Sequence, residues 1–92
     1  MRFHFDTAKQ SANFKKHGYD LTDAQGVIES RRTMTFEDNR FDYGEARFVT
    51  MGLLAGVVVV IATAETETES EIRVISMRKA DRHEQKIYFE YA

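Results

Sequence analysis

The 92-residue sequence contains no cysteine, no proline and no tryptophan. The absence of cysteine excludes disulfide bonds, zinc sites with cysteine ligands and catalysis by a thiol. Long hydrophobic runs are also absent: the longest, Val57 to Ala62, is far shorter than the roughly 20 residues that span a bilayer. Since the N-terminus carries no apolar export signal either, we expect a cytoplasmic protein that makes no contact with a membrane.

A surplus of positive charge is missing as well. Thirteen Lys and Arg residues face 15 Asp and Glu residues, which gives a net charge of −2. Proteins that bind nucleic acid usually carry a basic surplus, so this average argues against them. Four of the acidic residues alternate within one segment: Glu65, Glu67, Glu69 and Glu71. Outside that segment 13 basic residues face 11 acidic ones, so the average does not exclude a local basic cleft.

The residues that are present indicate one globular domain, residues 1–92, with 42% hydrophobic and 30% charged residues. Hydrophobic periodicity predicts strands and helices in a definite order. In chain order we expect a short edge strand (2–5), helices over 7–16 and about 24–30, strands over 33–36, 47–51, 57–63 and 72–77, and a closing helix over 82–91. This order predicts an α+β fold with the helices on one face of a small antiparallel sheet.

Short local signals predict where the helices begin and end. Asp6 is placed to act as N-cap of the first helix, and Gly18 is a natural residue just past its C-terminus. Residues 22–25 and 81–84 each fit a capping box, with a side-chain acceptor followed three residues later by Gln or Glu. These two boxes predict the start of the second and the closing helix.

The chain also suggests how its core is built. The strand over 57–63 is continuously apolar, so we expect it at the centre of the sheet, covered on both faces. We expect the strands over 47–51 and 57–63 to form a hairpin, with Gly52 and Gly56 at the two ends of its turn. On the closing helix, one face is predicted to pack on the core; its residues are His83, Ile87 and Tyr91.

No motif for a metal or a cofactor is found in the sequence. None of the three histidines, His4, His17 and His83, has a second ligand at metal-binding spacing on a helix face. A glycine-rich phosphate loop and a serine nucleophile motif are also absent. Acid–base chemistry without metal or cofactor is therefore the chemistry that the residues favour.

Six polar residues are candidates for that chemistry: Lys16, His17, Glu45, Arg47, Arg73 and Arg78. A base, an acid and planar guanidinium groups suit cleavage of an RNA phosphodiester, in which negative charge builds up on phosphorus. Each candidate also has a simpler interpretation. His17 could serve only as a capping cation, Glu45 and Arg47 could form an exposed ion pair, and the other arginines could be solvated surface residues.

Three blocks of the sequence resemble the family of BrnT-type toxins. Residues 5–18 contain an aromatic residue and Asp, then Lys, Asn and Lys-His-Gly at the family's spacing. Residues 43–52 resemble its Gly-Glu-x-Arg-Phe block, and residues 72–80 its Ile-Arg-Ile-Ile-Ser-Ala-Arg-Lys-Ala block. The blocks occur in the family's order over nearly the whole chain, which makes the resemblance specific.

The resemblance implies a RelE-like fold with two N-terminal helices and a C-terminal helix on a small antiparallel sheet. It implies a metal-independent endoribonuclease toxin that stops translation and growth. The implied partner is a BrnA-type ribbon-helix-helix antitoxin, through which the complex would bind operator DNA. The family's polar motifs match Lys16, His17, Glu45, Arg47, Arg73 and Arg78. Under this hypothesis Glu45 or His17 is the base, and the three arginines bind the phosphate.

One departure from the family pattern concerns Glu65, which stands where an Arg is usual at the end of an apolar strand. A carboxylate beside the phosphate would repel it. Two functions therefore stay open, an active ribonuclease and a weak or inactive module that only binds an antitoxin or another chain. The alternating segment 65–71 would place its glutamates on one strand face. That segment could be a solvated hairpin extension, a docking strip for a basic partner, or a Thr/Ser surface for homodimerisation.

Overall fold

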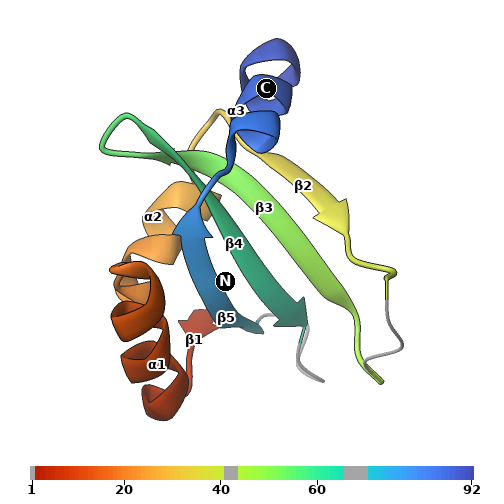
Figure 1. Cartoon of the computed structure of the whole chain (residues 1–92). Helices are drawn as coiled ribbons and strands as arrows, with labels where there is room; N and C mark the ends of the chain where they lie inside the picture. The colour runs from red at the N-terminus through yellow and green to blue at the C-terminus, as the bar shows by residue number, and fades with distance from the viewer. Residues whose placement is uncertain (1, 41–43, 66–70) are drawn as a thin grey trace.

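The computed structural model describes residues 2–40, 44–65 and 71–92. Its elements are β1 (Arg2–His4), α1 (Thr7–His17), the 3-10 helix η1 (Leu21–Asp23), α2 (Ala24–Ile28), β2 (Met34–Glu37), β3 (Arg47–Leu54), β4 (Val57–Glu65), β5 (Glu71–Lys79) and α3 (Arg82–Tyr91). The described strands form one five-stranded sheet in the order β1-β5-β4-β3-β2 (Figure 1). The α+β class is thereby confirmed. None of the described helices is long and apolar enough to cross a membrane.

The sheet is mixed, so the prediction of a purely antiparallel sheet is wrong. The strands from β2 to β5 pair antiparallel with their neighbours, whereas β1 runs parallel to β5. Most of the chain separates β1 from β5, so no tight turn forces these two strands into an antiparallel arrangement. The sequence pattern of a three-residue edge strand contains no information about its direction.

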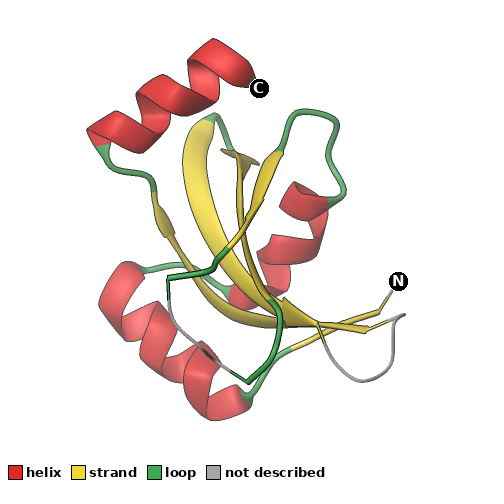
Figure 2. Ribbon diagram, turned by 90° about the vertical axis from the view of Figure 1, so that its right-hand side faces the viewer, coloured by secondary structure: helices red, strands yellow, loops and turns green. Residues whose placement is uncertain are grey.

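The helices cover both faces of the sheet, which corrects the expectation that they lie on one face. Val59 and Ile61 of β4 belong to one core cluster with residues of η1 and α2. Val58 and Val60 belong to a second cluster with Tyr88 of α3. Because side chains alternate along a strand, these two pairs point to opposite faces, and α2 and α3 lie on opposite sides of the sheet (Figure 2). The prediction that this apolar strand is central and doubly covered is confirmed.

Helix α1 is placed at the edge of the sheet by one buried side chain. Its ends agree with the sequence signals: Asp6 accepts hydrogen bonds from two backbone N–H groups of the first turn, and Gly18 is left-handed with φ 77°. Asn13 Oδ1 accepts from Met77 N at 3.1 Å, and Asn13 Nδ2 donates to Met77 O at 3.0 Å. The Asn13 amide thus bonds the backbone of β5 as a neighbouring strand would.

The predicted capping box at residues 22–25 does not form. Asp20 caps the preceding 3-10 helix instead, and its Oδ1 accepts from both the backbone N and the hydroxyl of Thr22. The backbone hydrogen bond from Thr22 is the main cause that lowers the pKa of Asp20 below its ordinary value. Gln25 is therefore free to donate to Glu29 one turn later on α2.

The hairpin between β3 and β4 is tighter than the glycine spacing predicts. Ala55 and Gly56 alone form the turn, both with positive φ (50° and 78°), as in a two-residue hairpin loop. Gly52 lies inside β3, so its prediction as a turn residue is wrong. A Cβ at Gly52 would lie 2.6 Å from Val27 Cγ1, so the glycine allows α2 to approach the sheet closely.

The capping box of α3 is confirmed, and of its predicted inner face Ile87 packs against the core, whereas the prediction is wrong for His83 and Tyr91. Asp81 accepts from Glu84 N, and the Glu84 side chain accepts from Asp81 N. Tyr88 is fully buried and its hydroxyl donates to Arg32 O at 2.7 Å, whereas Tyr91 is 73% exposed and His83 is exposed. The helical period fits either set of residues, and packing of the Tyr88 ring on β3 and β4 decides between them.

Candidate functional site

Three of the candidate arginines lie on the sheet face that α3 partly covers, here called the arginine face. Side chains of directly paired strand residues share a face. On this face, one row of paired residues across the sheet consists of Phe36, Val49, Ala62 and Ser76. The next row, farther from α3, consists of Arg47, Ala64 and Arg73. Arg78 pairs with Val60, one row closer to α3. Val60 and Ala64 are four residues apart on β4, so about 13 Å of strand separates Arg78 from the row of Arg73.

A β-bulge brings Arg73 and Arg78 to the same face. The two arginines are five residues apart, and strict alternation along a strand would point them to opposite faces. The register between β4 and β5 shifts between Ala62 and Thr63, which leaves Ile75 as the additional residue of β5. Bulges of this kind re-aim side chains and are frequent beside active sites. Both guanidinium groups therefore belong to one surface.

Glu45 lies two residues before the start of β3 and joins Arg47 to Arg73; these three residues are called the Glu45 cluster. Glu45 Oε1 accepts from Arg73 Nη2 at 2.6 Å and from Arg47 Nε and Nη2 at 3.4 Å each. Their side chains are 27% to 32% exposed, so solvent and a substrate can both reach them. Two cations around one carboxylate leave a positive surplus. Arg73 Nε is buried and has no hydrogen-bond partner among the described residues.

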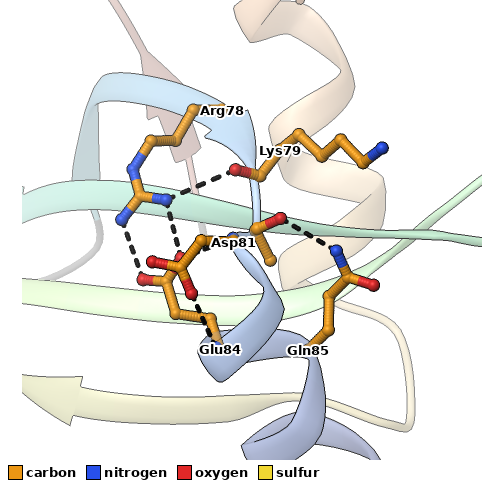
Figure 3. Close-up of polar contacts among 6 residues, drawn as sticks. Arg78, Lys79, Asp81, Glu84 and Gln85 are labelled. Atoms are coloured by element: carbon orange, nitrogen blue, oxygen red, sulfur yellow. Dashed lines mark hydrogen bonds and ion pairs between the residues drawn. The ribbon is translucent and has the colours of Figure 1, made fainter.

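Arg78 is held by α3 rather than by the Glu45 cluster. Its Nη1 and Nη2 donate to the two carboxylate oxygens of Glu84 at 2.7 and 2.8 Å, while Glu84 also serves the capping box with Asp81 (Figure 3). The hydrogen bonds from Arg78 are the main cause that lowers the pKa of Glu84, and those to Glu84 raise the pKa of Arg78. Glu84 therefore occupies the guanidinium fork that a phosphate would use.

This ion pair predicts a dependence of stability on pH. Because the pKa of Glu84 is lowered in the folded state, the pair stabilises the fold above the ordinary value of 4.5 and loses this effect as pH falls through the folded pKa. Glu84→Gln keeps a capping-box acceptor but removes the charge. We expect the variant to be less stable by under about 1 kcal/mol near pH 7, and the difference to shrink below pH 4.5.

Urea denaturation of both proteins between about pH 3 and pH 7, a range that spans the ordinary pKa of a glutamate, measures this effect. Glu29→Gln is a control, since Glu29 is exposed just after α2 and pairs only with Gln25 among the described residues. A stability difference for Glu84→Gln that stays constant over this pH range would contradict the assignment of the lowered pKa to the pair with Arg78.

Lys16 and His17 lie at the end of α1 and border a separate cavity. This cavity, of about 430 Å³, is shared with Ser76 and Arg78 of β5. His17 is half-buried and Lys16 is exposed. Within residues 2–40, 44–65 and 71–92, neither side chain forms an ion pair or hydrogen bond with another candidate. The structure thus divides the six candidates into the Glu45 cluster and a second group around Arg78.

A groove on the arginine face includes Arg78 and lies beside the row of the Glu45 cluster, and several of its residues were missed by sequence reasoning. The groove, of about 400 Å³, has Val49, Val60 and Ala62 as its floor. Phe36 of β2 and the loop that follows it form one side; Ser76, Arg78 and Glu84 form the other. Phe36 occurs in a β-prone run, which signals a strand but not a ligand site. Glu84 was recognised only as a cap.

The match with a known family covers every residue of this site. The model of the family described as ribonuclease toxin BrnT of type II toxin–antitoxin systems matches residues 5–84. The chain belongs to the BrnT family. A search of curated proteins finds no match. The BrnT match includes the Glu45 cluster, the second group around Arg78 and the Phe36 groove, and confirms the resemblance seen in the sequence blocks. BrnT proteins are ribonuclease toxins, and a type II system pairs each toxin with an antitoxin.

Glu65, the departure from the BrnT pattern, lies away from the arginines. Ala64 is the β4 residue paired with Arg47 and Arg73, so the next side chain, Glu65, points to the opposite face. There it borders a cavity with Phe48 and other residues of the α2 side. The Glu65 carboxylate and the arginines are therefore on opposite faces of the sheet, so Glu65 does not lie beside a phosphate bound on the arginine face.

The alternating acidic segment is not a single strand with all its glutamates on one face. Glu65 pairs with Ile72 across the β4–β5 hairpin, so Glu71, one residue before Ile72, points to the opposite face from Glu65. Glu71 forms an ion pair with Arg2 of β1 at 3.5 Å, and its Oε2 lies 3.9 Å from His4 Nε2 of the same strand. Glu67 and Glu69 lie outside the described residues. The prediction of one shared face is wrong for the two ends of the segment.

Proposed function

We propose that this chain is a metal-independent endoribonuclease with a RelE-like architecture, which cleaves RNA by general acid–base chemistry and thereby stops translation and growth. A BrnA-type ribbon-helix-helix antitoxin would neutralise it and bind operator DNA for the complex. The observation that carries the proposal is the gathering of Arg47, Arg73 and Arg78 on one accessible face, which requires the bulge at Ile75. Guanidinium groups suit a phosphate that gains charge during cleavage.

In this mechanism the RNA backbone crosses the Glu45 cluster. Arg73 and Arg47 bind the non-bridging phosphate oxygens, with the unpartnered Nε of Arg73 as an additional donor. Glu45 Oε1 is shared by the two arginines, while its Oε2 makes no hydrogen bond within the described part of the chain. Oε2 is therefore placed to accept the proton of the attacking 2′-hydroxyl.

The leaving 5′-oxygen needs a proton when its bond to phosphorus breaks. We propose that water delivers this proton, because the Glu45 cluster is partly open to solvent. His17 borders the Arg78 end of the site, about 13 Å of strand from the row of Arg73, and is proposed to lie along the path of the RNA there. Lys16 adds positive charge beside it. The reaction forms a 2′,3′-cyclic phosphate and a 5′-hydroxyl end, so the proton taken by Glu45 is balanced by the one that water gives to the leaving oxygen.

The test is cleavage of a defined single-stranded RNA by the purified chain, with and without EDTA. We expect fragments ending in a cyclic phosphate, at equal rates in both conditions. Growth arrest on induced expression, relieved by co-expressed antitoxin, would accompany this activity. The alternative function is a binding module without activity; the carboxylates that already occupy Arg73 and Arg78 favour it. Intact RNA and unimpaired growth, with antitoxin binding retained, would establish that alternative.

A further inference from the structure

The groove between Phe36 and Arg78 has no role in the proton transfers above. Its floor consists of small and medium apolar side chains, Val49, Val60 and Ala62, on adjacent central strands. Its volume of about 400 Å³ is within the range of cavities that enclose small organic groups. The row of Arg47 and Arg73 borders the row of the groove directly on the sheet. A group attached to a phosphate at the Glu45 cluster could therefore extend into it.

Phe36 gives the groove an aromatic side wall. It is 47% exposed although it points to the same face as the apolar floor, since it pairs with Val49. An aromatic ring that is left half in solvent beside an apolar floor can stack on a planar partner. Every nucleobase has such a face, and stacking on aromatic side chains is a general way to bind single-stranded RNA.

The polar groups of the groove also fit a base. The hydroxyl of Ser76 on one side and the amide of Asn39 on the other form no hydrogen bond within the described segments. A hydroxyl and an amide both donate and accept, as the edges of bases require. Arg40 and Arg78 line the groove beside the carboxylates of Asp38 and Glu84 with which they pair, and Glu37 lines it as well. The positive charge for a flanking phosphate comes from the adjoining row of Arg47 and Arg73. The ligand that this combination favours is a ribonucleotide.

We propose that this groove binds a nucleobase, with Phe36 stacking on the base next to the phosphate held by Arg47 and Arg73. The inference rests on the proposed function, because it takes RNA as the substrate. It adds a binding residue outside the catalytic set. Phe36 then contributes to affinity for the nucleotide, whereas the Glu45 cluster acts on the phosphate.

The absence of tryptophan from the chain provides a direct test. In Phe36→Trp the new indole is the sole tryptophan, and its fluorescence reports stacking in the groove. The probes are two oligoribonucleotides of equal length, 2′-O-methylated so that they cannot be cleaved: one complete, the other with abasic sites throughout. We expect the complete strand to quench the indole and the abasic strand to leave it largely unchanged. Equal quenching by the two strands, or no quenching by either strand, would overturn the inference.

Affinities of the same probes complete the test. We expect Phe36→Ala to bind the complete strand about tenfold or more weakly, and Phe36→Trp to restore the affinity. Phe14→Ala is the matched control, because Phe14 is an exposed aromatic residue of α1 that does not line the groove. A Phe36→Ala variant that keeps its RNA affinity but binds antitoxin less well would assign the groove to the antitoxin and overturn the inference.

The two proposals can fail separately. Cleavage by the parent with unchanged binding and cleavage in Phe36→Ala would leave the ribonuclease assignment standing and overturn the base site. Selective quenching of Phe36→Trp by the complete strand, in a protein that cleaves no RNA, would support the base site and contradict the proposed catalysis.

Discussion

Replacing Arg73 with alanine is expected to lower the rate of RNA cleavage about 100- to 1,000-fold, the usual loss when a preorganised donor to a developing anion is removed. Arg73 has the shortest contact with Glu45, at 2.6 Å, and keeps a buried Nε without a partner among the described residues. The substitution would remove the donors to the phosphate and one of the two cations that hold the proposed base. Initial rates of cleavage of a fluorescent RNA, at saturating and subsaturating concentrations, measure the effect.

Two further variants give this experiment its controls. Arg2→Ala removes a largely exposed arginine from β1, the strand next to β5, and is expected to leave the rate unchanged. Arg73→Lys keeps the charge but loses the planar fork, so we expect it to recover only part of the activity. Full activity of Arg73→Ala, with an unchanged melting temperature, would remove Arg73 from the proposed phosphate site.

Much of the fold could be predicted from local sequence signals. Asp6, Gly18 and the capping box at residues 81–84 act within a few residues of themselves, and the structure confirms each of them. The apolar run of β4 predicted the central position of that strand, because a strand covered on both faces is apolar at successive positions. One local signal, the capping box at residues 22–25, is wrong because Asp20 caps the preceding 3-10 helix instead. Two other wrong predictions concern tertiary packing: Gly52 is set by the approach of α2, and the inner face of α3 by the burial of Tyr88. Neither of these contacts is encoded by periodicity within its own element.

The candidate site likewise combines a contact that local sequence predicts with contacts that depend on the tertiary fold. Glu45 and Arg47 are two residues apart, and their contact follows from strand geometry. Arg73 is 28 residues from Glu45, and its place beside the carboxylate depends on strand order. The shared face of Arg73 and Arg78 depends on a bulge for which their spacing gives no signal. Sequence reasoning therefore named these residues individually, but could not assemble them.

The structure also explains how an acidic chain can carry a basic site. Glu45 and Glu84 each lie against arginines of the arginine face, so part of the acidic total is used inside the site itself. A phosphate that binds there replaces contacts already made to carboxylates. The net charge of −2 therefore says little about this surface, because positions and not totals determine the local field.

Replacing Asn13 with alanine is expected to have the largest effect on stability. The Asn13 side chain is buried and hydrogen-bonds both the N–H and the C=O of Met77. Alanine would leave these two backbone groups without partners, at about 1–3 kcal/mol each, so we expect a loss of about 2–6 kcal/mol. A domain of this size is typically stable by only about 5–14 kcal/mol, so the variant could approach unfolding. Urea denaturation followed by circular dichroism measures the loss.

Asn13→Asp keeps the prediction testable even where the alanine variant does not fold. In that variant an ionised carboxylate can accept from Met77 N but cannot donate to Met77 O, whereas the protonated acid can do both. Burial disfavours the ionised form, so we expect its stability deficit relative to the parent to narrow as pH falls toward about 4, the ordinary pKa of an aspartate, and to stay constant below that pH. Ser11→Ala, at an exposed position of α1, is expected to change stability by under about 0.5 kcal/mol. If Asn13→Ala were equally mild, α1 would be held to β5 by contacts other than this amide, and the position of Lys16 and His17 beside Arg78 would need another cause.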